Sequence, residues 1–433
     1  MNSPDNQNRN LPRVFALNVV ETLRGAGFSA LWAGGCVRDD LLGIPPKDYD
    51  VATNATPDQV IELFGKRKTV PVGVSFGVVM VLGPTRAHGQ VEVATFRADG
   101  EYLDGRRPSA VSFCSAEEDA KRRDFTINGM FFDPVTLNVI DYVGGRTDLA
   151  NNVLRAIGDA NARFTEDKLR MLRAVRFAAT YEFSIEPSTA SAIKQLSHQI
   201  TQVSAERIAQ ELRRMLVHST RAISVRNLYE TGLAEVLFPK LFPSSSNRQQ
   251  FDDTLQQVCD SLNHLKLPAF ESSFAVLMYS LFDEHAANSR DRVADILAEC
   301  HILKLSNEET DCICWLADSA LVCRNANRLP LHIIKPLLHD SRSPLLLDLL
   351  AAQAFSRLQS PEDAVFLTRY LEHTTTDALN PPPFVDGADL KQLGIQPGPI
   401  FKQLLTTIRN EQLDEILLTR EQAIERLRQL NSS

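Results

Sequence analysis

The 433-residue sequence lacks several features that would assign it at once to a common class. It has no apolar run of about 18 residues, so we expect no transmembrane helix and no membrane partner. Its N-terminal segment, MNSPDNQNRNLPR, lacks the apolar core of a signal peptide and is typical of a short disordered lead-in. The 7 cysteines include no CxxC pair, which argues against structural zinc or disulfides and favours a cytoplasmic location.

Several chemical signatures are missing too. The sequence contains no Walker loop, nucleophile elbow or zinc-ligand spacing, and no repeat of about 20–50 residues. The dipeptide His339–Asp340 could suggest a phosphohydrolase, but no companion ligands follow at helical spacing, so we interpret it as a surface helix end. A net charge of −8 argues against a protein that coats nucleic acid nonspecifically, although a local basic face could still bind RNA.

The composition is that of a globular protein, with 44% hydrophobic and 23% charged residues, and the length predicts two to four domains. Side-chain periodicity predicts a helix over 14–25 and strands over 30–32, 48–52, 78–82 and 91–96. These elements would form a small mixed sheet with helices that ends near residue 150. From residue 161 the pattern is helical, with linkers at 239–250 and 379–390. We therefore expect an α/β head followed by a long helical arm.

The most informative segment is LWAGGCVRDDLLGIPPKDYDVAT, residues 31–53. On an extended strand, Asp48 and Asp50 would project from one face, about 6–7 Å apart, and could hold divalent cations together with substrate phosphates. The turn at Gly34 and Gly35 would let the backbone approach a triphosphate, with a helix N-terminus behind it. Alone, each motif is more often a solvated turn or a bend. Their joint spacing indicates nucleotidyl transfer to an RNA hydroxyl with release of pyrophosphate.

Glu92 is the first supporting residue. It lies on a predicted strand, with Val91 and Val93 facing the opposite side. If that strand neighbours the one bearing Asp48 and Asp50, the three carboxylates converge on one metal site. The alternative is an exposed strand glutamate.

A second group lies in KRRDFTINGM, residues 121–130. Arg122, Arg123 and Asp124 begin a predicted helix, and Asn128 falls one turn later. Arginine suits phosphate or ribose contacts, and Asp124 could accept a ribose hydroxyl proton. A solvated charge cluster is the plainer alternative. The preceding loop, residues 97–113, could move during the reaction or could be a solvated hairpin.

The third group is EDKLRMLRAVRFA, in which Asp167, Arg170, Arg173 and Arg176 recur every three residues along one predicted helix face. Aspartate accepts hydrogen bonds, whereas arginine donates them. Adenine and cytosine both offer an amine donor beside a ring-nitrogen acceptor, so an Asp167–Arg170 pair could select ATP and CTP. GTP and UTP would leave polar groups unpaired. The alternative is a surface salt-bridge ladder.

Seven ordered segments between residues 31 and 241 carry a family resemblance: LWAGGCVRDDLLG, KDYDVAT, VEVATFR, RRDFTINGM, DYVGGRTDL, EDKLRMLRAVRF and SAERIAQEL. With them the chain resembles the class II tRNA nucleotidyltransferases, which are CCA-adding enzymes, and the related bacterial poly(A) polymerases. The resemblance implies a DNA polymerase beta-like nucleotidyltransferase head at 1–150. An all-α neck with base recognition (151–220), body (221–380) and tail (381–433) would follow.

The resemblance also implies roles for particular residues. Asp48 and Asp50 would bind Mg²⁺, with Glu92 as a third carboxylate. The partners would be the tRNA 3′ end, ATP and CTP. The nucleotide-binding positions would be Gly34, Gly35, Arg38, Arg123, Asp124, Asn128, Asp167, Arg170, Arg173 and Arg176.

CCA-adding enzymes and bacterial poly(A) polymerases are harder to tell apart from the sequence. Bacterial poly(A) polymerases carry a GRRF-like segment where this chain has VGVSFGVVMV, and DGADLKQLGIQPGPIFKQLL resembles the CCA-adding tail. We therefore expect CCA addition, with A addition alone or poly(A) synthesis as alternatives. A catalytically silent RNA-binding protein is a remote third. The segment SFAVLMYSLF lacks the His-Asp pair of some long relatives, so we expect no phosphohydrolase activity.

Overall fold

The computed structural model describes residues 11–73, 77–99, 111–241, 248–282, 289–356 and 361–431. Internal contacts divide the chain into two compact units. The first unit comprises Met1–Glu211 with Asn227–Pro239, and the second comprises Leu212–Arg226 with Lys240–Ser433. Among the described residues, no helix has the length and apolar character needed to cross a membrane.

A seven-stranded mixed sheet forms the centre of the head; the sequence predicted a mixed sheet and four of these strands. Its central pair, β2 and β5, is parallel, and every other neighbouring pair is antiparallel. In spatial order the strands are β3 (Thr69–Gly73), β4 (Val78–Leu82), β5 (Gln90–Thr95), β2 (Tyr49–Thr53), β1 (Ala30–Ala33), β8 (Phe131–Asp133) and β9 (Asn138–Ile140).

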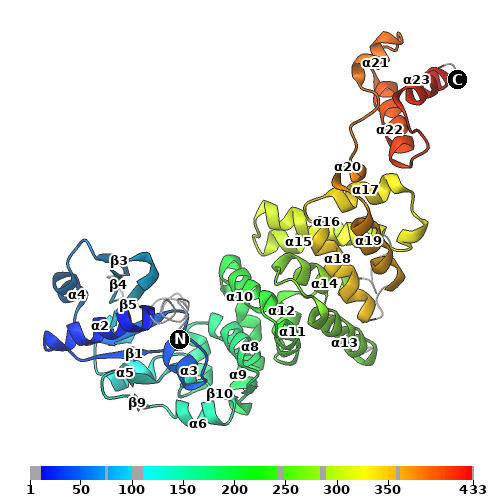
Figure 1. Cartoon of the computed structure of the whole chain (residues 1–433). Helices are drawn as coiled ribbons and strands as arrows, with labels where there is room; N and C mark the ends of the chain where they lie inside the picture. The colour runs from blue at the N-terminus through cyan, green and yellow to red at the C-terminus, as the bar shows by residue number, and fades with distance from the viewer. Residues whose placement is uncertain are drawn as a thin grey trace. The chain divides into compact units, whose positions relative to one another are not determined.

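Helices of the head pack against the strands and leave one part of the sheet open. Val79 and Val81 of β4 and Val91 and Val93 of β5 are buried, whereas Glu92 between them is exposed. This alternation places the apolar side chains toward α2, which runs along the sheet (Figure 1). The head helices are α2 (Leu11–Gly25), α3 (Gly35–Leu41), α4 (Pro57–Phe64), α5 (Ala116–Lys121) and α6 (Gly145–Ala150), with the 3-10 turns η2 (Arg86–His88) and η3 (Thr126–Asn128).

The rest of the first unit is helical except for one short parallel pair. Strand β10 (Val153–Leu154) pairs with β11 (Ser184–Ile185), so the expectation of an all-α neck was wrong in this detail. Strands of two residues are too short to show an alternating pattern in a sequence. The helices that follow the head are α7 (Ala160–Glu166), α8 (Leu169–Tyr181), α9 (Pro187–Leu196), η4 (Ser197–Gln202), α10 (Ala205–Val217), α11 (Arg221–Glu230) and α12 (Leu233–Leu237).

The second unit is built from helices alone in its described residues. His339 ends α17 and Asp340 caps it, which confirms the predicted helix end. A separate core near the C-terminus joins the last three helices through Leu390, Ile408 and Leu427. The helices are α13 (Arg248–His264), α14 (Phe270–Phe282), α15 (Ser289–Ile302), α16 (Asn307–Val322), η5 (Ala326–Arg328), α17 (Leu331–His339), α18 (Ser343–Phe355), α19 (Pro361–His373), α20 (Thr376–Leu379), α21 (Gly387–Gln392), α22 (Pro399–Leu413) and α23 (Arg420–Asn431).

The predicted loop 97–113 is described at its two ends. Strand β6 (Arg97–Asp99) pairs antiparallel with β7 (Val111–Phe113), which forms the stem of a hairpin. Residues 100–110 lie outside the described residues, as do the lead-in 1–10, residues 74–76 and residues 242–247 of the predicted linker.

Candidate active site

The acidic residues of the head lie on two neighbouring strands. Strand β2 pairs in parallel with β5, and the register places Asp50 directly beside Glu92. Asp48 comes just before β2, and Tyr49, which separates the two aspartates, is buried while both aspartates are exposed. The structure therefore confirms that the Glu92 strand neighbours the Asp50 strand, with the acidic side chains on the open face.

Burial, and for Asp50 the neighbouring carboxylates, change the protonation of the acidic residues. Desolvation by the surrounding walls, followed by the charges of Glu92 and Asp48, raises the pKa of Asp50 to about 6, and Arg123 opposes this rise. Desolvation also raises the pKa of Glu92, and Arg97 opposes it. Mutual repulsion of this kind is relieved when a cation binds between the carboxylates.

The acidic group is not a complete metal cage. Among the described residues, no three His, Cys, Asp or Glu side chains gather closely enough to hold an ion by themselves. A magnesium ion commonly uses one or two carboxylates and takes its remaining ligands from substrate phosphates and water. The hard oxygens of Asp48 and Asp50 fit that donor set, with Glu92 beside them.

Gly34 is the point where the acidic face meets an arginine. Its φ of 72° is strained for any residue with a side chain, and it caps the N-terminus of α3. A Cβ added there would lie 3.2 Å from Nη1 of Arg123 and 3.9 Å from Oδ2 of Asp50. A Cβ on Gly35 would lie 3.4 Å from Nη2 of Arg38. The predicted glycine pair thus brings the backbone close to both arginines and to the carboxylate.

A chain of hydrogen bonds runs from the head into α8. Arg38 donates through Nη1 to Oδ1 of Asn128, 2.5 Å away, and Nδ2 of Asn128 donates to Oδ1 of Asp124 over 3.1 Å. Arg173 on α8 then donates through Nη2 to Oδ2 of Asp124 over 2.6 Å. Four residues predicted to bind the nucleotide are therefore in direct contact with one another.

The segment Arg122–Asp124 does not begin a helix as expected but follows the end of α5. A capping box between Ser115 and Glu118 starts that helix earlier. Buried Asp119 holds both arginines, with Oδ1 2.7 Å from Nη2 of Arg122 and Oδ2 2.9 Å from Nη2 of Arg123.

Asp124 is a hydrogen-bond acceptor rather than a base. Its burial would raise its pKa, but the neighbouring Arg173 and the hydrogen bond from Asn128 outweigh burial and lower the pKa to about 2. A carboxylate with such a low pKa accepts a hydroxyl proton poorly. The low pKa argues against deprotonation of a ribose hydroxyl by Asp124, and a contact of Asp124 with the ribose stays a prediction.

The two candidate base-reading residues lie at the junction of two helices. Asp167 has an extended backbone between α7 and α8, so it does not share a helix face with Arg170, as had been expected. Its carboxylate accepts from the backbone N–H of Leu169, which favours this helix start. Arg207 on α10 also binds it, with Nη2 2.9 Å from Oδ2. Arg170 pairs with Glu166 over 2.5 Å.

Arg176 belongs to the same helix but serves a different neighbour. Its Nε donates to Oε2 of Glu211 over 2.6 Å, and that carboxylate is almost fully buried. A salt bridge at such a site requires both partners, because removing one leaves a buried charge.

Sequence reasoning missed the acidic and basic partners that hold these residues. They are Asp39, Asp119, Glu166, Arg207 and Glu211. The spacing of Asp119 to Arg122 and Arg123, and of Glu166 to Arg170, is the helical i, i+3 or i, i+4 pattern and could have been found. The pairs from Arg207 and Glu211 span 40 and 35 residues and leave no local pattern.

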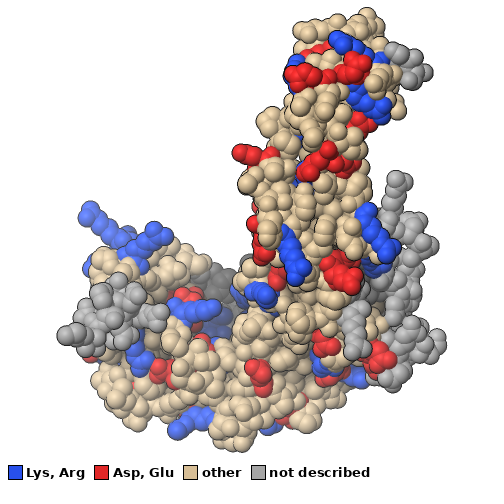
Figure 2. Space-filling view, turned by 45° about the vertical axis from the view of Figure 1, so that its right-hand side comes forward, with Lys and Arg blue, Asp and Glu red and all other residues tan. Residues whose placement is uncertain are grey.

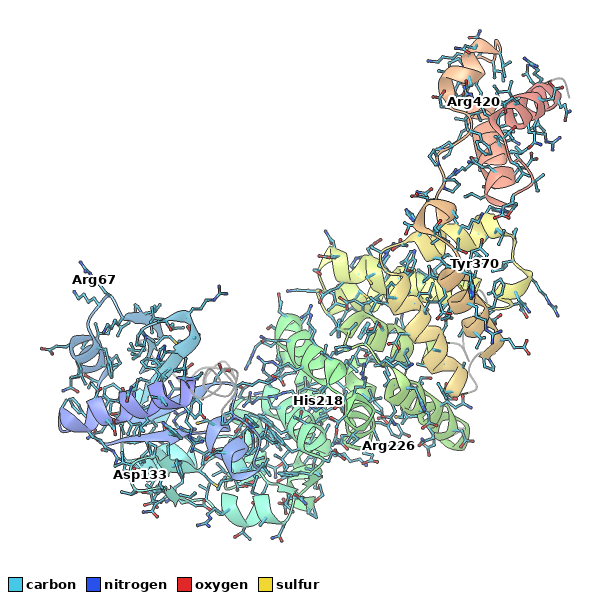
Figure 3. The ribbon with its side chains drawn as sticks, in the orientation of Figure 1. Arg67, Asp133, His218, Arg226, Tyr370 and Arg420 are labelled. Carbon is cyan, nitrogen blue, oxygen red and sulfur yellow. The ribbon has the colours of Figure 1, made fainter. Side chains whose placement is uncertain are left out.

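Charged side chains of both signs are interspersed on the surface. Over the second unit, the face drawn in Figure 2 shows blue and red groups alternating rather than one basic patch. On the head, the exposed cations Lys66, Arg67 and Lys68 connect α4 to β3, and Arg67 points into solvent (Figure 3). A local basic edge therefore exists despite the net negative charge.

Comparisons with known proteins agree with this geometry. A family model described as "Poly A polymerase head domain" matches residues 30–155, and one described as "Probable RNA and SrmB- binding site of polymerase A" matches 182–244. A CCA-adding enzyme from Streptococcus suis is 31% identical over 429 residues, which cover 96% of each chain. This chain belongs to the CCA-adding enzyme family.

Other members of the family match as well. The CCA-adding enzyme of Geobacillus stearothermophilus is 42% identical over 219 residues, 50% of this chain and 53% of that one. A crystal structure of the Bacillus stearothermophilus CCA-adding enzyme in complex with CTP superimposes with a TM-score of 0.76 and 27% identity, covering 97% of this chain and 99% of that chain. The Thermotoga maritima CCA-adding enzyme complexed with tRNA-CCA has a TM-score of 0.65 at 21% identity and supports the fold alone.

As a CCA-adding enzyme family member, the chain is a nucleotidyltransferase with a nucleotidyltransferase head and a mainly helical remainder. The family is in general metal-dependent.

Proposed function

We propose that this protein builds and repairs the CCA 3′ end of tRNA. It transfers CMP from CTP and AMP from ATP to the RNA 3′-hydroxyl without a nucleic-acid template, and pyrophosphate leaves. The observation that carries the proposal is the parallel register that sets Asp50 beside Glu92, with Gly34 and Arg123 against the same carboxylate. Relatives over the full length are CCA-adding enzymes, which favours this product over A addition alone or poly(A). A cytoplasmic location stays a prediction.

Asp48 and Asp50 are the proposed ligands of Mg²⁺, with Glu92 as the third carboxylate. When bound, the ion would neutralise phosphate charge and lower the pKa of the attacking RNA hydroxyl. The raised pKa of Asp50 is consistent with this: desolvation is its largest cause, and the charges of Glu92 and Asp48, which a bound cation would neutralise, add to it.

The triphosphate is assigned to the arginines beside the glycine turn. Arg123 lies next to Gly34 and Asp50, and Arg38 lies next to Gly35. Their forked guanidinium groups donate paired hydrogen bonds to phosphate oxygens. Asp124 and Asn128 hold Arg173 and Arg38 in place beside the proposed position of the ribose.

The base is assigned to Asp167 and Arg170. The Asp167 carboxylate accepts from the exocyclic amine of adenine or cytosine, and the Arg170 guanidinium donates to the adjoining ring nitrogen. Their present partners, Arg207 and Glu166, fix both side chains before a base arrives. Arg173 supports this arrangement through Asp124, and Arg176 through Glu211.

The four-part division stays part of the proposal. The head (1–150) would carry the chemistry and the neck (151–220) the base recognition, while the body (221–380) and tail (381–433) would bind tRNA. The match of residues 182–244 to an RNA-binding model supports an RNA role beyond the head.

The test offers the purified protein tRNA transcripts that end before CCA, after C and after CC. Each transcript is incubated with magnesium and CTP, ATP or both, and the products are sized to one nucleotide. We expect completion to CCA and no further growth. Addition of A to the CC transcript alone would establish an A-adding enzyme, and a long ladder on generic RNA would establish a poly(A) polymerase.

A further inference from the structure

Three guanidinium groups surround one buried phenylalanine ring on α8. The Cζ atoms of Arg38, Arg173 and Arg176 lie 5.2, 5.2 and 4.1 Å from the centroid of the Phe177 ring. Phe177 is only 7% exposed. Distances within about 6 Å of an aromatic centroid are those of cation–π contacts.

Each of these arginines also forms a salt bridge with a carboxylate, and the three carboxylates belong to three different segments. The three carboxylates come from α3, from the residues after α5 and from α10, so the ring lies where these segments meet α8. The pairs are Arg38–Asp39 at 2.8 Å, Arg173–Asp124 at 2.6 Å and Arg176–Glu211 at 2.6 Å.

The carboxylates hold Arg173 and Arg176 at the Nε side of the guanidinium group, whereas Arg38 is held by Asp39 and also by Asn128. An aromatic face attracts the cation and resists rotation of its plane, and the attraction strengthens where water is excluded. A leucine could fill similar space, but it has no negative ring face. Arg38 gains a second contact of this kind from Tyr181, at 4.4 Å, whereas Phe177 is the ring beneath Arg173 and Arg176.

We propose that Phe177 is a positioning residue for nucleotide binding, whose ring electrons orient Arg38 and Arg173 for the incoming nucleotide. This rests on the proposed function in one respect, namely that these two arginines approach the nucleotide. In this role Phe177 acts through the arginines that lie against its ring. Because it acts on groups that bind either nucleotide, the KM values for CTP and ATP should change together.

The experiment replaces Phe177 with phenylalanine analogues that carry one, two or three ring fluorines. Fluorine withdraws electrons from the ring face while nearly preserving shape and hydrophobic volume, so a packing role is scarcely affected. We expect the KM for both nucleotides to rise stepwise to on the order of tenfold with three fluorines, with kcat little changed. The Kd of each magnesium nucleotide, measured by titration calorimetry, should rise in parallel.

Phe164 on α7 is the matched control. It is 1% exposed in the same unit, and within the described part of the chain no cation lies over its ring. The same fluorinated series there should leave KM and Kd unchanged. The melting temperature of each variant shows whether it folds normally. The fluorinated series is preferred to Phe177→Leu, because leucine changes the packing as well as the ring electrons.

A flat response of KM and Kd across the Phe177 series, in a protein that extends tRNA normally, would overturn the positioning role and leave the proposed function standing. A wild-type protein that extends no RNA would refute the proposed function. The Kd series would in that case still decide the positioning role, since stepwise weakening supports it and constant binding rejects it.

Discussion

At the scale of single residues, the site combines one carboxylate whose charge destabilises the fold, Asp50, with other carboxylates that are paired with arginines. Desolvation and the charges of Glu92 and Asp48 together raise the pKa of Asp50 to about 6. Asp124 has the opposite environment, with Arg173 and Asn128 bonded to its two oxygens. The surroundings disfavour the charge of Asp50 and favour the charge of Asp124. Neutralising the two residues should therefore have opposite effects on the stability of the fold.

Neutralising Asp50 should stabilise the metal-free protein. Because its folded-state pKa lies above the ordinary value of 3.8, the ionised form costs stability that accrues as the pH rises toward and through about 6. Asp50→Asn should therefore raise the melting temperature at pH 8 and change it little at pH 4. The exposed Glu62→Gln on α4 is the control and should show no such difference. A variant that melts below the wild type at pH 8 would contradict this account.

Neutralising Asp124 should destabilise the protein. Its folded-state pKa of about 2 lies below the ordinary 3.8, so the ion pair stabilises the fold above about pH 4. This stabilisation is lost as the pH falls toward 2. Asp124→Asn should lower the free energy of unfolding by about 2 kcal/mol at neutral pH. In urea titrations the gap between variant and wild type should narrow below pH 4, and a pH-independent gap would count against the ion pair.

At the scale of elements, the start of α3 determines how closely the backbone approaches the acidic face. Gly34 and Gly43 flank this helix, and both have positive φ, 72° and 71°. A Cβ at Gly34 would crowd Arg123, whereas a Cβ at Gly43 would meet nothing within 4 Å. A substitution at Gly43 therefore tests a side chain at positive φ alone, whereas one at Gly34 also displaces Arg123.

Gly34→Ala and Gly43→Ala should both lower stability by about 1 kcal/mol, because each places a side chain at positive φ. Only Gly34→Ala should also raise the KM for CTP and ATP, since Arg123 must shift. Steady-state kinetics alongside unfolding curves would measure both effects. Equal KM values for the two variants would show that the approach of Gly34 to Arg123 is irrelevant to nucleotide binding.

At the scale of elements, the sequence predicted strands and helices better than the residues at which the helices begin. Alternating side chains predicted the strands of Asp50 and Glu92, but their adjacency was only a condition of the predicted metal site, and the fold meets it. The helix expected from Arg122 and the shared helix face of Asp167 and Arg170 were wrong. The capping box at Ser115 starts α5 before Arg122, and the extended backbone of Asp167 leaves it outside α8. A periodic pattern locates a helix but fixes its first turn poorly.

At the scale of the whole molecule, contacts between distant segments hold the site together. Arg207 reaches Asp167 across 40 residues, and Tyr181 reaches Asp39 across 142, where its hydroxyl donates over 2.9 Å. Such pairs leave no trace in one sequence, since any arginine could serve any aspartate. Family resemblance identified the arginines, but only the fold shows which carboxylates orient them.

Nucleotide binding should stabilise one unit selectively, because the candidate site lies within the first. In calorimetry, magnesium with CTP at about 100 times its Kd should add about 2.7 kcal/mol to the unfolding free energy of that unit. The transition of the second unit should stay in place, and Asp50→Asn should abolish the shift. An equal shift of both transitions would place the binding elsewhere.

The most direct test of the central claim is the extension of a tRNA transcript that ends before CCA, supplied with magnesium, CTP and ATP. Wild-type protein, Asp50→Asn and the control Glu62→Gln are compared with products sized to one nucleotide. If Asp48, Asp50 and Glu92 hold the catalytic metal, the wild type and the control add CCA, and Asp50→Asn extends nothing. Extension by Asp50→Asn at the wild-type rate would contradict it.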